Sequence, residues 1–172
     1  MTDDHVMILG VGNLLLSDEG FGIRVVEELE RRYTFPDNIS VVDGGVLGVS
    51  LLGVMSEADQ LIVVDVIRNK GVPGDLYRLA GDAIPERIRA KNSLHQVDFL
   101  EALTLCQAMD KVPEAVILGV EPEDINTLST ELTETTKNRM EDVIQMVLGE
   151  LDRLGITCQD KGTGDHVSCN PI

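Results

Sequence analysis

The feature that most constrains the fold is a set of short apolar runs that alternate with amphipathic helical segments. Four runs have the length of buried strands, and one of them, residues 61–65, is apolar up to its final residue, Asp65. A strand without polar alternation is typical of a sheet that is covered on both faces. The other three runs lie at residues 6–11, 39–43 and 115–120, and residues 75–79 alternate as a shorter edge strand would.

Amphipathic segments lie between these runs. Residues 20–33 carry Ile23, Val26 and Leu29 at helical spacing, and a long final helix is predicted to begin at Thr133. Two further helices are predicted at residues 48–55 and 93–108. Because strands alternate with helices, we expect an α/β fold with a mostly parallel sheet. We expect residues 1–156 to form a single domain and residues 157–172, which lack periodicity, to form a flexible tail.

The excess of acidic over basic side chains limits the classes of partner that the protein can bind. The 172 residues include 14 basic and 30 acidic side chains, which gives a formal net charge of −16. Nucleic acids and anionic membranes require basic surfaces, so neither is expected as a partner. The apolar runs are far shorter than the roughly 20 residues of a membrane-spanning helix. The acidic start lacks the basic region of a signal peptide, and three cysteines make no disulfide framework, so we expect a cytoplasmic protein. The strong negative charge is consistent with a monomer when the protein is free.

Carboxylates follow several of the predicted strands. Asp18 and Glu19 lie in the loop after the first strand, Asp43 ends the second and Asp65 ends the third. In open α/β sheets, ligands bind beyond the carboxyl ends of the strands, where these side chains would meet. Neighbouring carboxylates repel each other, and a bound cation would relieve that repulsion. The alternative is structural: each Asp could cap a turn, and Asp18 could accept hydrogen bonds from backbone amides of its own glycine-rich loop.

His95 is the one histidine inside the predicted core and begins a predicted helix at the same end of the sheet. A Glu, an Asp and a His with open coordination positions would suit a borderline cation such as nickel or zinc. His95 could instead be a hydrogen-bonded residue at a helix start. The residues alone leave both interpretations open.

Two glycine motifs also have alternative interpretations. Gly10 and Gly12 follow a strand as in a dinucleotide-binding loop, but Leu15 stands where that motif requires its third glycine. Carboxylates in this loop would also repel a pyrophosphate, which argues against the alternative of a nucleotide-binding module. Gly44 and Gly45, which follow Asp43, favour either a tight turn or a loop that lets a peptide backbone approach closely.

An ordered set of segments resembles the hydrogenase maturation endopeptidases, which trim the C-terminal extension from the large-subunit precursor of nickel-iron hydrogenases. The resemblance spans about residues 6–154 and rests on residues 8–22 (ILGVGNLLLSDEGFG), 42–45 (VDGG), 62–67 (IVVDVI), 93–96 (SLHQ) and 119–122 (GVEP). One position departs from the family pattern, because Val46 stands where the family commonly has Thr. This chain therefore lacks the family's hydroxyl at that position.

The resemblance implies a three-layer α/β/α sandwich around a twisted five-stranded sheet with one antiparallel strand, which residues 75–79 would supply. It places Glu19, Asp65 and His95 on the family's metal and catalytic positions. Asp43, Gly44 and Gly45 fall on a loop associated with substrate recognition or cleavage. It also implies that nickel arrives with the bound precursor and is not held permanently. Zinc or cadmium could occupy the same ligands in vitro.

The expected function is therefore a metal-dependent endopeptidase that removes a C-terminal peptide from the nickel-loaded precursor. The metal could polarise the scissile carbonyl or activate a water, with Asp65 or Asp43 as an aspartyl protease-like general base. The alternative is a non-enzymatic chaperone that binds nickel or the loaded precursor through the same ligands.

Overall fold

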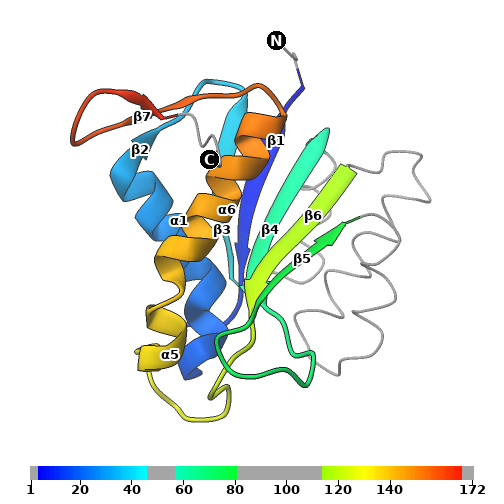
Figure 1. The fold of residues 1–172 in the computed structure, drawn as a ribbon, viewed down its shortest axis with the longest axis vertical. Helices are drawn as coiled ribbons and strands as arrows, with labels where there is room; N and C mark the ends of the chain where they lie inside the picture. The colour runs from blue at the N-terminus through cyan, green and yellow to red at the C-terminus, as the bar shows by residue number, and fades with distance from the viewer. Residues whose placement is uncertain (1–3, 46–56, 81–113, 168–172) are drawn as a thin grey trace.

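The centre of the molecule is a five-stranded sheet (Figure 1). The computed structural model describes residues 4–45, 57–80 and 114–167. The strands lie in the order β3 (Ile39–Gly45), β1 (Val6–Val11), β4 (Gln60–Val66), β6 (Glu114–Val120) and β5 (Leu76–Ala80). The first four are parallel, and β5 pairs antiparallel with β6. The predicted mostly parallel sheet with one antiparallel strand is confirmed.

Both faces of this sheet are buried, which explains the uninterrupted apolar runs. In β1, Ile8 belongs to the hydrophobic cluster on one face and Leu9 to the cluster on the other, and neither is exposed to solvent. In β4, Ile62 likewise belongs to the first cluster and Val63 to the second. Alternating residues of a strand point to opposite faces, so a strand that is covered twice must be apolar at every position.

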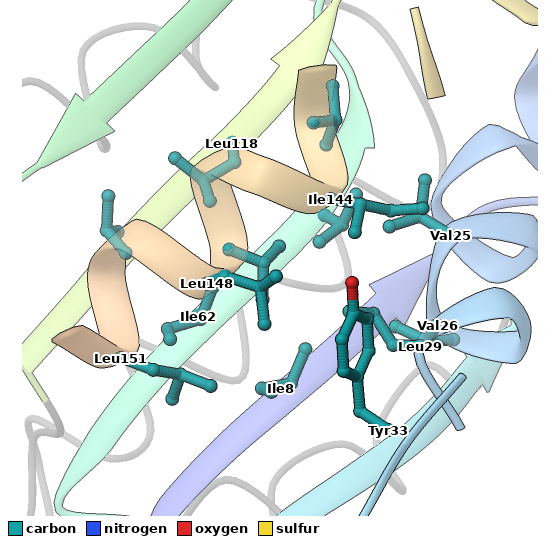
Figure 2. Packing of buried hydrophobic residues seen from close by; sticks show 14 of the residues in the cluster. Ile8, Val25, Val26, Leu29, Tyr33, Ile62, Leu118, Ile144, Leu148 and Leu151 are labelled. Atoms are coloured by element: carbon teal, nitrogen blue, oxygen red, sulfur yellow. The ribbon is translucent and has the colours of Figure 1, made fainter. Parts of the chain in front are cut away.

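Two helices, α1 (Phe21–Arg32) and α6 (Met140–Arg153), cover one face of the sheet. Figure 2 shows how their apolar sides meet the strands: side chains of β1, β4 and β6 lie among those of the two helices, and the labelled members are Ile8, Val25, Val26, Leu29, Tyr33, Ile62, Leu118, Ile144, Leu148 and Leu151. The helices predicted at residues 48–55 and 93–108 lie outside the described residues. No helix in the described part of the chain is long and apolar enough to cross a membrane.

The final helix differs from the prediction of one continuous element that begins at Thr133. Thr133 is the N-cap of a short helix, α5 (Glu134–Lys137), and α6 begins only at Met140. Between them the backbone tightens, because the Arg139 N–H donates to the Thr136 carbonyl three residues earlier and not four (3.0 Å). The four residues of α5 are polar and the apolar stripe begins at Met140, so the predicted start at Thr133 rested on capping residues and not on the stripe.

The segment after Gly155 also differs from the prediction of a flexible tail over residues 157–172. Its described part forms two strands, β7 (Cys158–Asp160) and β8 (His166–Val167), which pair with each other and with β2 (Tyr33–Thr34) in a small antiparallel sheet. Cys158 is buried in the main hydrophobic cluster. These strands are too short to show periodicity, and the pairing partner of β7 lies more than a hundred residues earlier, so no local pattern predicts them.

A glycine sets how closely α1 approaches the sheet. A Cβ atom at Gly22, in the first turn of α1, would overlap the backbone carbonyl oxygen of Val64 in β4 and crowd that of Val11 in β1. The absence of a side chain therefore allows the helix to begin directly against two strands. This contact fixes the start of α1, and with it the segment that precedes the helix, at the carboxyl ends of β1 and β4.

We predict that Gly22→Ala destabilises the fold by more than about 2 kcal/mol, because backbone atoms must move to admit the methyl group. The matched control is Gly149→Ala in α6, where a Cβ atom has no neighbour within 4 Å. That change should be neutral or stabilising by up to about 1 kcal/mol, because alanine favours a helix. Urea unfolding of both variants measures the difference, and equal stabilities would contradict the close contact at Gly22.

Candidate functional site

The candidate site lies at the carboxyl ends of the parallel strands. Glu19 belongs to η1 (Ser17–Gly20), the 3-10 turn that joins β1 to α1, and Asp65 is the penultimate residue of β4. The turn packs against β4. Glu19 is 7% exposed and Asp65 5%, so two acidic side chains are largely buried at one sheet edge. Glu19 and Asp65 thus belong to elements that meet at the carboxyl ends of the parallel strands, and their joint action stays a prediction.

Backbone contacts fix the turn that carries Glu19. The N–H of Asn13 donates to the Glu19 carbonyl (3.0 Å), and the N–H of Glu19 donates to that of Leu16 (3.1 Å). Gly12 adopts a φ of +150°, and a Cβ atom there would overlap the carbonyl oxygen of Glu19. Glycine is therefore required at the point where the chain leaves β1 and folds back on itself. These backbone contacts hold the Glu19 backbone at the carboxyl end of β1.

Asp65 is held by its own strand end. Its Oδ1 accepts a hydrogen bond from the N–H of Val66 (2.8 Å), and its backbone pairs with Gly119 of β6. A carboxylate that follows four buried apolar residues is costly to desolvate unless polar contacts or a cation compensate. The side chains of Glu19 and Asp65 can thus supply oxygen ligands or a general base at this edge.

Asp18, the neighbour of Glu19, has a structural role. Its side chain is fully buried and accepts hydrogen bonds from the N–H groups of Glu123 (2.9 Å), Asp124 (3.0 Å) and Thr133 (2.8 Å). The hydroxyls of Thr133 and Thr136 also donate to it, the latter at 2.6 Å. Asp18 therefore accepts hydrogen bonds from backbone amides, as the structural alternative predicted. The amides, however, belong to the segment after β6 and not to the loop of Asp18 itself.

These donors determine the ionisation of Asp18. Burial alone would raise the pKa of its carboxyl, but the hydrogen bonds from the Thr136 hydroxyl and from the three backbone N–H groups outweigh that effect and lower the pKa below its usual value. Asp18 is consequently a buried anion whose charge is balanced by oriented dipoles. It joins the turn before α1 to the loop after β6.

Asp43, Gly44 and Gly45 lie at the end of β3, the edge strand beside β1. Asp43 is exposed and pairs with Gly10, whereas the next pair is Val11 with Gly45, so the register shifts at Gly44. Bulges of this kind re-aim side chains and are frequent beside active sites. The glycines continue the strand up to Gly45, and Val46 and the following residues lie outside the described part.

The third predicted ligand cannot be placed. His95 lies outside the described residues, so its proximity to Glu19 and Asp65 remains a prediction. Among the residues that the structure describes, no group of three His, Cys, Asp or Glu side chains could hold a metal ion. A metal site at this edge would therefore need a ligand from elsewhere, and His95 is the one that the sequence proposes.

Glu121 is a buried carboxylate that the strand-end argument did not single out. It follows β6 directly, is 6% exposed, and its Oε2 accepts hydrogen bonds from the N–H of Asn69 (2.8 Å) and the hydroxyl of Tyr77 (3.0 Å). Burial, together with this hydrogen bond, raises the pKa of Tyr77 to about 12. Glu121 thus holds the loop after Asp65 against β6. The signal was available, because Glu121 follows an apolar strand just as Asp65 ends one.

Comparison with known proteins identifies the family. The sequence model of the family described as hydrogenase maturation protease matches residues 23–150. The hydrogenase 2 maturation protease of Escherichia coli is 36% identical over 88% of this chain and 93% of its own length. The hydrogenase expression/formation protein HupD of Bradyrhizobium diazoefficiens is 37% identical over 90% of the chain and 82% of its own length. This chain belongs to the hydrogenase maturation protease family.

The solved structures agree with this family assignment. The hydrogenase maturating endopeptidase HybD from E. coli superposes with a TM-score of 0.88 at 34% identity, over 92% of this chain and 98% of that one. The α/β fold predicted from the sequence is thus confirmed, and the protein is a hydrolase that acts on peptide bonds. The non-enzymatic chaperone is not favoured. The family match from residue 23 to residue 150 includes the positions of Asp43, Asp65 and His95, whereas Glu19 precedes it.

We predict that Asp18→Asn lowers the stability of this maturation protease by about 3 kcal/mol at neutral pH, because an amide replaces a charged acceptor among buried donors. The folded-state pKa of Asp18 lies below the unfolded value of about 3.9, so its stabilisation is present above that pH and is lost as the pH falls through the lower folded value. The difference between wild type and variant should therefore shrink below about pH 4.

Urea unfolding at a series of pH values measures this difference. The control is Asp37→Asn, which removes one negative charge from an exposed position. The free energy of unfolding of the control should match that of the wild type at neutral pH. A penalty for Asp18→Asn that did not decrease in acid would contradict the assignment of Asp18 as an ionised acceptor.

Proposed function

We propose that this protein removes a C-terminal peptide from the nickel-loaded large-subunit precursor of a nickel-iron hydrogenase. The proposal is supported by the pair of buried carboxylates, Glu19 and Asp65, at the ligand-binding edge of a fold shared with hydrogenase maturation proteases. Acidic side chains shielded from water can supply anionic oxygen ligands to a cation, whose charge would offset their desolvation.

In this proposal, nickel belongs to the substrate. Glu19, Asp65 and His95 bind the nickel of the precursor through open coordination positions, and so dock the scissile bond at the sheet edge. The metal supplies Lewis-acid character to that bond or to a water. Asp65 or Asp43 accepts the proton of the attacking water, since both are carboxylates near this edge. A precursor without nickel lacks the group that the ligands recognise, which explains the selectivity.

Asp43, Gly44 and Gly45 are proposed to contact the peptide around the scissile bond. They end the edge strand β3, where the register shifts between the Gly10–Asp43 pair and the Val11–Gly45 pair. Because glycine has no side chain, a peptide backbone can approach this strand end closely. The position of Asp43 at the exposed end of β3 suits a side chain that meets a substrate from solution.

We predict that Glu19→Gln, Asp65→Asn and His95→Ala each reduce processing of the nickel-loaded precursor at least a hundredfold, because each removes one metal-binding group. Mass spectrometry of the precursor over time measures the cleavage, and thermal unfolding checks that each variant is folded. Glu30→Gln serves as the control, because it makes the same charge change at an exposed position of α1. Wild-type cleavage by all three variants would rule out this ligand set.

The role of nickel is tested with the wild-type protein and two preparations of one precursor, with and without nickel. We expect loss of a short C-terminal peptide from the loaded form alone, with many turnovers per protease molecule. Equal cleavage of both forms would contradict nickel as the recognition signal. Tight binding of the loaded form with no change of mass would instead support the chaperone.

A further inference from the structure

The exposed apolar residues of the described structure gather at one edge of the sheet. The large hydrophobic side chains that remain exposed there are Leu15 (57%), Val72 (69%), Leu76 (36%) and Leu128 (80%). Leu15, Val72 and Leu128 lie beyond the carboxyl ends of the parallel strands β1, β4 and β6, and Leu76 begins antiparallel β5. Single exposed leucines are ordinary, but their restriction to the edge that carries the candidate site indicates an interaction surface.

Leu15 and Leu128 form the best-defined part of this surface, which we call the leucine patch. The N–H of Ser129 donates to the carbonyl of Leu15 (2.9 Å), and the N–H of Ser17 donates to the carbonyl of Ser129 (2.8 Å). Two segments more than a hundred residues apart in the sequence are thus joined backbone to backbone. The buried Asp18 carboxylate binds the same two segments together. The patch is therefore preformed, which lowers the entropic cost of binding a partner.

The two segments that carry the leucine patch are acidic. Arg24 of α1 reaches one of them, where it donates to the carbonyl of Thr130 (3.1 Å), but its guanidinium is paired with Glu27 (3.2 Å). Residues 13–20 and 121–132 contain acidic side chains but no Lys or Arg. Glu123 and Glu131 are the exposed members, and both lie within a few residues of Leu128. The surface thus has an apolar centre and an acidic rim. Its complement is an apolar side chain or small apolar area flanked by Lys or Arg.

We propose that the leucine patch docks the folded precursor protein through an apolar area bordered by basic residues. This inference rests on the proposed function, because it assigns the contact that holds the substrate beside Glu19, four residues after Leu15. Charge complementarity selects this occupant. A second copy of the chain would place two acidic rims against each other, and an anionic lipid surface would be repelled in the same way.

The first test is Leu15→Ser combined with Leu128→Ser. Both side chains are exposed, so thermal unfolding should be unchanged, whereas the KM for the nickel-loaded precursor should rise at least tenfold with kcat altered less than twofold. A purely structural defect would lower kcat or stability instead. Direct binding of the same precursor to the immobilised protease, measured by interferometry, should weaken by the same factor as KM rises.

The second test concerns the acidic rim. Glu123→Gln combined with Glu131→Gln should raise KM at low salt by about threefold to tenfold, and the KM of the wild type should rise with salt concentration. The matched control is Glu30→Gln combined with Asp37→Asn, which makes the same charge change at exposed positions near the opposite end of the sheet. The control should retain the wild-type KM. An equal effect of both pairs would show that only the overall charge matters.

The outcomes separate this inference from the proposed function. If the wild type cleaves the loaded precursor and the leucine double variant keeps its KM and affinity, the docking assignment is wrong and the function stands. If the wild type neither cleaves nor binds the precursor, both are wrong. If the wild type self-associates and the leucine variant is monomeric in sedimentation, the patch joins copies of the chain and the docking assignment is again overturned.

Discussion

The arrangement of the site edge depends on one buried anion. Asp18 accepts hydrogen bonds from three backbone N–H groups and two threonine hydroxyls, all contributed by residues 123–136. A buried charge without such donors would cost several kcal/mol, so the carboxylate can exist only when the segment after β6 has closed over it. Folding of that segment and placement of η1 are therefore one event. Glu19, the next residue, takes its position from this closure.

Adjacent acidic residues in one loop thus have different tasks. Asp18 is saturated with donors, and its low pKa expresses how strongly those donors favour the charged form. Glu19 lies in η1 and Asp65 in β4, two elements that pack together. The sequence could nominate all three because each follows or ends an apolar strand. The sequence could not show which of them has the structural role, because that depends on which carboxylate accepts hydrogen bonds from the distant Thr133 and Thr136.

The same distinction explains which elements were predictable. The central strands β1, β4 and β6 are largely continuous apolar runs because both of their faces are buried, so a local pattern is enough, and β1 occurs as predicted over Val6–Val11. The break before Met140 and the pairing of β7 with β2 depend on contacts between distant segments, which periodicity does not record. The predicted role of His95 cannot be judged in the same way, because that residue lies outside the described part.

The proposed chemistry also explains why a protease that cleaves a single protein would need a preformed apolar surface to recognise it. A set of three ligands for nickel reports that a metal is present, but it carries little information about which protein holds it. The leucine patch and its acidic rim would supply that information, because their shape and charge select a partner surface rather than a metal. Asp18 and its hydrogen-bond donors connect the leucine patch to the proposed nickel ligands, since they bind the loop of Leu128 to the turn of Glu19. Docking would then align the peptide with the carboxylates without movement of the site.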